Sequence, residues 1–122
     1  MITVLAVGVA AALGAVARYV LNQYVQYRSP STFPRGIWLI NITGSFVLGL
    51  LVGLGARHGL PEQVLTVGGV GFCGAYTTFS TFSYDLVRLC KERRVGKSVL
   101  YGASSLTAGL LTAAAGLVIG SL

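Results

Sequence analysis

The sequence predicts an all-α membrane protein with four transmembrane helices, in a single domain that takes in residues 1–122. Of these residues, 54% are hydrophobic and only 10% are charged, whereas a soluble domain has about 25% charged residues. The apolar residues form four runs, each close to the length of about 20 residues that a helix needs to cross a bilayer. The runs are too long for barrel strands and lack their in-out alternation, so helices are expected.

Charged residues and prolines set the limits of the four runs. The first loop contains Pro30 and Pro34, the second contains Gly59 and Pro61, and the third is the basic stretch 91–97. Proline and glycine interrupt helices and charge is costly in hydrocarbon, so each interruption predicts a loop. The expected spans are residues 2–24, 37–56, 64–89 and 98–122.

Arg18 is the notable residue of the first span, because it lies within or at the end of an apolar run. It either extends its charge to the lipid headgroups or attracts anions toward a pathway. In the second span, Asn41 must find a hydrogen-bond partner, since an unpaired amide in an apolar medium costs about 2–7 kcal/mol. Two interpretations stay open for Asn41: a hydrogen bond to another helix, or a donor to a permeating species.

The third span is expected to be broken near its middle. It contains Gly68, Gly69, Gly71 and Gly74, followed by two threonines, which favours a break near residues 74–76. Irregular backbone deep in a membrane is tolerated only where protein buries it or where water or an ion contacts it. A broken span therefore predicts an ion or substrate site.

Phe79 and Phe82 are three residues apart and so lie on one helical face, among Ser and Thr residues. A phenyl ring has a positive edge, so rings presented edge-on among hydroxyl donors can solvate a small anion. Asp85 is the only carboxylate within the spans and lies toward a loop, so the embedded acid of a proton-coupled or cation-coupled exporter is missing. These observations favour anion conduction, with lipid-facing or core phenylalanines as the alternative.

The remaining motifs do not indicate catalysis or cofactor binding. One histidine and three scattered acids leave no acid-base pair, so the chain is not expected to be an enzyme. The G-x-G-x-x-G match at 69–74 lies inside a span and not in a βαβ unit. Cys73 and Cys90 form no cluster of metal ligands. The basic loop is typical of cytoplasmic loops, so no nucleic-acid partner is expected.

Three segments closely resemble the Fluc (CrcB) family of fluoride channels: residues 14–19 (GAVARY), 41–46 (NITGSF) and above all 71–83 (GFCGAYTTFSTFS). The resemblance covers the whole chain in length and number of spans. It implies passive, fluoride-selective export across a prokaryotic plasma or inner membrane. It also implies an antiparallel, dual-topology homodimer with two pores and a central structural Na⁺.

The resemblance assigns roles to individual residues. It makes Asn41, Phe79 and Phe82 pore-lining and gives the Na⁺ the backbone carbonyls of Gly74 and Thr77. It places Ser80, Thr81, Tyr101 and Ser105 in a polar track beside the fluoride path and makes Arg18 the cation of a vestibule.

This sequence departs from the family pattern in several places. Residues 35–38 (RGIW) replace a usual Gly-Thr pair, Ala75 replaces a glycine, and Gly109 stands where the track has a hydroxyl. The first and third loops, with the flanking helix ends, hold seven Lys and Arg residues against Arg57 opposite. This bias predicts one fixed orientation, so pairing with an oppositely inserted homologue is the alternative to a homodimer. A small proton-coupled multidrug exporter and a non-transporting membrane subunit are the other functions considered.

Overall fold

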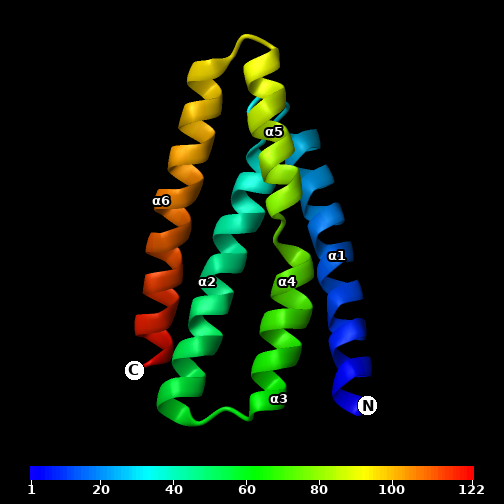
Figure 1. The fold of residues 1–122 in the computed structure, drawn as a ribbon, viewed down its shortest axis with the longest axis vertical. Coiled ribbons are helices and arrows are strands. Elements are labelled where there is room, and N and C mark those ends of the chain that lie inside the picture. Colours follow the sequence, from blue (N-terminus) through cyan, green and yellow to red (C-terminus); the bar gives the residue numbers. More distant parts are fainter.

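The computed structural model describes residues 1–122, and every regular element in it is helical (Figure 1). This confirms the all-α class. The elements, in chain order, are α1 (Ile2–Arg28), α2 (Arg35–His58), α3 (Glu62–Leu65), the π-helix η1 (Thr66–Cys73), α4 (Gly74–Tyr76), α5 (Phe79–Lys91) and α6 (Val95–Gly120). Helices α1, α2 and α6 are each long and apolar enough to cross a membrane. The third expected span consists of four shorter pieces, so no single helix in it reaches that length.

The break in the third span is confirmed, but it lies slightly later than glycine content suggested. Gly74 is still helical, with φ −62° and ψ −37°. The backbone becomes extended at Thr77, with ψ 160°, and at Thr78, with φ −150° and ψ 122°. Thr78 then caps α5, because its side-chain oxygen accepts a hydrogen bond from the Thr81 N–H. The cap, and not the glycines, sets the position of the break.

Helices α2 and α6 pack backbone to backbone. A side chain at Gly49 of α2 would overlap the carbonyl oxygen of Ala113, and one at Gly116 of α6 would overlap that of Phe46. In lipid, such close approach of small residues is a main source of helix association. Helices α2 and α6 are therefore closely packed against each other. The part of the broken third span before the break lies on the side of α2 away from α6 (Figure 1).

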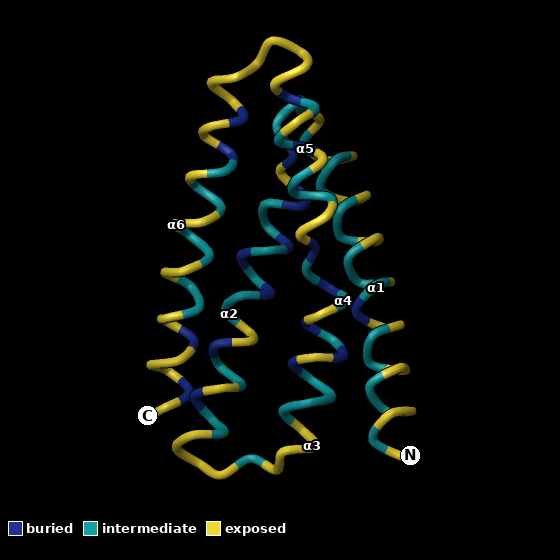
Figure 2. Tube along the Cα trace, viewed as in Figure 1, coloured by how far each residue is buried: buried dark blue, intermediate teal, exposed yellow.

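The outer faces of the helices are exposed (Figure 2), and many of the exposed residues are large and apolar. Examples are Val9, Leu13 and Val16 on α1, and Leu106 and Leu110 on α6. A soluble protein of this size rarely exposes so much contiguous apolar surface. The surface fits a protein surrounded by lipid.

The connections place the loops at two opposite ends of the bundle. The α1–α2 and α5–α6 connections lie at one end, and the α2–α3 connection lies at the other, together with both termini (Figure 1). Thr32 of the first connection accepts hydrogen bonds on its side-chain oxygen from Arg94 and Lys97, each at 2.9 Å. The basic residues of two loops thus meet at one end of the molecule.

Candidate functional site

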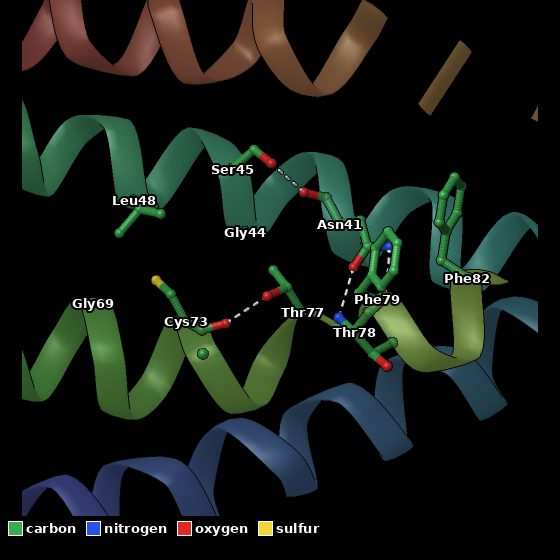
Figure 3. Close-up of a pocket in the computed structure, with 11 residues that line it drawn as sticks. Asn41, Gly44, Ser45, Leu48, Gly69, Cys73, Thr77, Thr78, Phe79 and Phe82 are labelled. Atoms are coloured by element: carbon green, nitrogen blue, oxygen red, sulfur yellow. Dashed lines mark hydrogen bonds between the residues drawn. The ribbon is translucent and has the colours of Figure 1, made fainter. Parts of the chain in front are cut away.

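A pocket of about 290 Å³ lies where the break of the third span faces α2 (Figure 3). Asn41, Phe79 and Phe82 stand at one end of it, and Leu48 and Gly69 stand at the other (Figure 3). None of its lining residues is charged. They are Asn41, Gly44, Ser45, Leu48, Gly69, Cys73, Gly74, Thr77, Thr78, Phe79 and Phe82.

The Asn41 amide pairs with the backbone of Thr78 at the break. Its Nδ2 donates to the Thr78 carbonyl at 3.1 Å, and its Oδ1 accepts from the Thr78 N–H at 2.9 Å (Figure 3). Thr78 is only 8% exposed, so these backbone groups have little access to solvent. Asn41 therefore replaces the helical hydrogen bonds that the break removes, which is the interhelical interpretation of this residue. Its Nδ2 has a second hydrogen that makes no hydrogen bond, and Asn41 lines the pocket.

The break also withdraws helical donors from the carbonyls that precede it, including two in residues that line the pocket. In a continuous helix the Thr78 N–H would donate to the Gly74 carbonyl, and the Thr81 N–H would donate to the Thr77 carbonyl. Here the Thr78 N–H donates to Asn41, and the Thr81 N–H donates to the Thr78 hydroxyl. Gly74 and Thr77 both line the pocket. Their carbonyl oxygens are thus left without these donors, which suits them to contact a cation.

Three aromatic rings follow one another away from the pocket. The ring centroids of Phe79 and Phe82 are 6.0 Å apart with the planes at 44°, and those of Phe82 and Tyr101 are 5.1 Å apart at 51°. These tilted arrangements are the ones that ring quadrupoles prefer. Phe79 is 79% exposed, whereas Tyr101 is fully buried. The buried ring of Tyr101 packs against Phe82, whereas Phe79 projects from the surface.

Ser80 and Thr81 belong to the first turn of α5. The hydroxyl of Ser80 lies 3.3 Å from that of Thr78, and the Thr78 hydroxyl donates to the Thr81 hydroxyl at 3.3 Å. Neither residue lines the pocket. They extend a chain of hydroxyl groups from the break along α5.

Tyr101, Ser105 and Arg18 lie outside the pocket as well. The hydroxyls of Tyr101 and Ser105 are buried and have no hydrogen-bond partner within 3.5 Å, and the Asp85 carboxylate lies close to the Tyr101 hydroxyl. They are four positions apart on α6, so they lie on one face. Such orphaned donors are uncommon, because an unpaired buried polar group costs about 1–3 kcal/mol. Arg18 is half-buried on α1.

The site holds no groups for acid-base or metal chemistry of the usual kind. Asp85, the carboxylate in the spans, lies 3.6 Å from the Arg88 guanidinium and does not line the pocket. No cluster of three His, Cys, Asp or Glu side chains exists in the chain. The pocket offers neutral donors, ring edges and carbonyl oxygens. Such groups can contact a small ion without a charged side chain.

Sequence reasoning missed some residues of the pocket. Thr78 looks in the sequence like one more residue of a hydroxyl-rich stretch, yet it caps α5 and forms both hydrogen bonds with Asn41. Ser45 was detectable, because it follows Asn41 by four residues and so shares its face. Its hydroxyl donates to the Asn41 carbonyl at 2.7 Å. Nothing in the sequence distinguishes Leu48 and Cys73, which also line the pocket, from ordinary packing residues.

Comparisons with known proteins agree with one another. The model of a family described as "CrcB-like protein, Camphor Resistance (CrcB)" matches residues 5–117. "Fluoride-specific ion channel FluC 1" of Leifsonia xyli subsp. xyli is 47% identical over 121 residues, which are 99% of this chain and 88% of that protein. "Fluoride-specific ion channel FluC" of Acidobacterium capsulatum is 42% identical over 116 residues, 94% of this chain and 93% of that protein. "Fluoride-specific ion channel FluC 2" of Rhodococcus jostii is 45% identical over 112 residues, 91% of this chain and 92% of that protein.

Proposed function

Because this chain belongs to the CrcB family, which consists of ion channels and not of enzymes, we propose that it is a passive, fluoride-selective channel. It would let cytoplasmic fluoride leave the cell down its gradient and so relieve fluoride toxicity. The observation that carries the proposal is the pocket at the break, whose 11 lining residues include ring, amide and hydroxyl groups but no charged side chain.

Neutral donors suit a conducting anion better than a cationic site does. Conduction requires binding that is strong enough to replace the water shell and weak enough for the ion to leave. The edges of Phe79 and Phe82 carry partial positive charge, and the free Nδ2 hydrogen of Asn41 adds one donor beside them. These three residues line the same pocket, so they act on one ion in our proposal.

The channel is proposed to be an antiparallel dimer with two pores along the interface. Phe79 is a large apolar residue that is 79% exposed beside the pocket, and a second copy would cover it. Four helices in one copy also enclose too little space for a wide pathway. We favour two identical copies in opposite orientations. The charge bias between the two ends is the reason to keep an oppositely inserted homologue as the alternative.

A structural Na⁺ fits the break. Hard cations take oxygen ligands, and among the carbonyls that lose their helical donors at the break, those of Gly74 and Thr77 belong to residues that line the pocket. Two copies meeting at the break would together supply four such oxygens. In this role the ion joins the subunits and holds the break open.

The remaining hydroxyls and Arg18 complete the proposed path. Ser80 and Thr81 continue from the break, and the unpartnered hydroxyls of Tyr101 and Ser105 would donate to fluoride along a polar track. Arg18 would raise the local anion concentration in a vestibule without lining the narrow part, as its position outside the pocket requires.

Efflux from liposomes tests the function directly. The purified protein is reconstituted into vesicles loaded with equal concentrations of fluoride and chloride, and each ion is followed with its own electrode. Rapid release of fluoride with almost no release of chloride is expected. Comparable rates for the two ions would contradict fluoride selectivity.

A further inference from the structure

The end of the bundle that holds the first and third connections is strongly basic. Seven Lys and Arg residues stand in these connections and the flanking helix ends, against two acids, Asp85 and Glu92. This is the upper end in Figure 1. The cations are Arg28, Arg35, Arg88, Lys91, Arg93, Arg94 and Lys97.

Two of these cations converge on one neutral oxygen. Arg94 Nη1 and Lys97 Nζ both donate to the Thr32 hydroxyl, at 2.9 Å each. The nearest acid to Arg94 is Glu92, at 3.9 Å, and Lys97 forms no salt bridge. A hydroxyl does not neutralise charge, and both side chains keep further N–H donors. An anion with several oxygens, such as a phosphate diester, is the partner that such donors fit.

An apolar groove begins beside this cluster. It has a volume of about 450 Å³ and lies between the ends of α1, α2 and α6. Phe33 follows Thr32 directly, and Leu100 follows Lys97 by three residues on the same face of α6. The lining residues are Val25, Ser29, Phe33, Arg35, Trp38, Leu39, Leu100 and Ser104.

The groove has the features of a membrane-water interface. Trp38 donates from Nε1 to the Ser104 hydroxyl at 3.0 Å, which joins α2 to α6 across it. Tryptophan is enriched at the level of the lipid headgroups. Arg35 lines the groove and donates to the Ser29 hydroxyl. Charge lies at the loop end, and apolar surface continues from it toward the spans.

We propose that this groove seats one anionic phospholipid, with the phosphate held by Arg35, Arg94 and Lys97 and one acyl chain along Phe33 and Leu100. A free phosphate has no acyl chain to occupy the apolar groove. A zwitterionic lipid has no net negative charge and so does not neutralise the excess of cations. The proposal does not rest on fluoride conduction, because it concerns a separate surface.

Native mass spectrometry of the purified protein tests this. The protein is titrated with phosphatidylglycerol or with phosphatidylcholine of the same chains. Preferential retention of phosphatidylglycerol is expected. Each cation near a lipid surface contributes about 1 kcal/mol, so the double variant R94Q/K97Q is expected to bind it about 30-fold more weakly. Arg57→Gln, at the opposite end, is the matched control and is expected to change nothing.

A second variant distinguishes lipid binding in the groove from non-specific electrostatic attraction of anionic lipid to the basic loops. Leu100→Trp fills the groove and keeps every cation, and it is expected to weaken phosphatidylglycerol binding at least tenfold. Excess glycerol 3-phosphate is expected not to displace the lipid. The proposal is overturned if the double variant and Arg57→Gln retain the lipid equally, if Leu100→Trp binds it as wild type does, or if glycerol 3-phosphate displaces it.

Discussion

Replacing Asn41 by leucine is expected to destabilise the protein at the break. The change keeps the approximate size of the side chain but removes both hydrogen bonds to Thr78, at 3.1 and 2.9 Å. It leaves a buried N–H and a buried carbonyl unpaired, each at a cost of about 1–3 kcal/mol, so about 2–6 kcal/mol is expected for the two. Hydrogen bonds between membrane helices average about 0.6 kcal/mol, so the loss of two average bonds alone would cost about 1.2 kcal/mol.

The free energy of unfolding is measured by titrating sodium dodecyl sulfate into mixed micelles, with fluoride efflux from liposomes recorded in parallel. Ser45→Ala is the control, because Ser45 lines the same pocket but its hydroxyl donates only within α2, to the Asn41 carbonyl. That variant is expected to stay within about 0.5 kcal/mol of wild type. If the free energy of unfolding of Asn41→Leu is less than about 1 kcal/mol below that of wild type, then Asn41 does not support the broken backbone, and the reasoning fails.

Three further predictions concern the rings, the packing and the cation. Phe79→Ile is expected to lower fluoride efflux at least tenfold, because it removes a ring that lines the pocket. Little stability is lost, because Phe79 is 79% exposed. The control variant Phe72→Ile changes a ring outside the pocket and is expected to remain selective for fluoride. Gly49→Ala is expected to cost about 1–3 kcal/mol through overlap with Ala113, whereas Gly8→Ala, which meets nothing within 4 Å, costs none of this; equal stabilities would contradict the close α2–α6 packing. Exhaustive replacement of Na⁺ by choline is expected to abolish efflux, and full activity after verified removal of Na⁺ would exclude the proposed cation site.

The helical elements were predictable because long apolar runs in lipid have few alternatives. The ends of the helices were less predictable than the helices themselves. Helix α1 continues to Arg28, beyond the expected limit at Tyr24, because a helix does not have to end at the membrane surface and the first proline is Pro30. The break was predicted from glycines, yet Gly74 remains helical and the chain opens at Thr77. Glycine content reports where a helix is weak, whereas a cap decides where a new one starts.

The candidate site was predictable to the extent that its residues share a face within one helix. Phe79 and Phe82 are an example, since three-residue spacing brings them together without knowledge of the fold. The partner of Asn41 lies 37 residues away on another element, and no local pattern identifies it. Tyr101 is similar, because its position behind Phe82 depends on how α6 packs against α5.

The interruption of the third span has an electrostatic consequence. The last turn of α4 ends at the break with free carbonyl groups, and the first turn of α5 begins there with free N–H groups. Peptide dipoles make the first of these ends negative and the second positive. A few residues of uncharged backbone therefore offer opposite partial charges side by side at membrane depth, and the chain avoids burying an ionised side chain in hydrocarbon, which costs several kcal/mol.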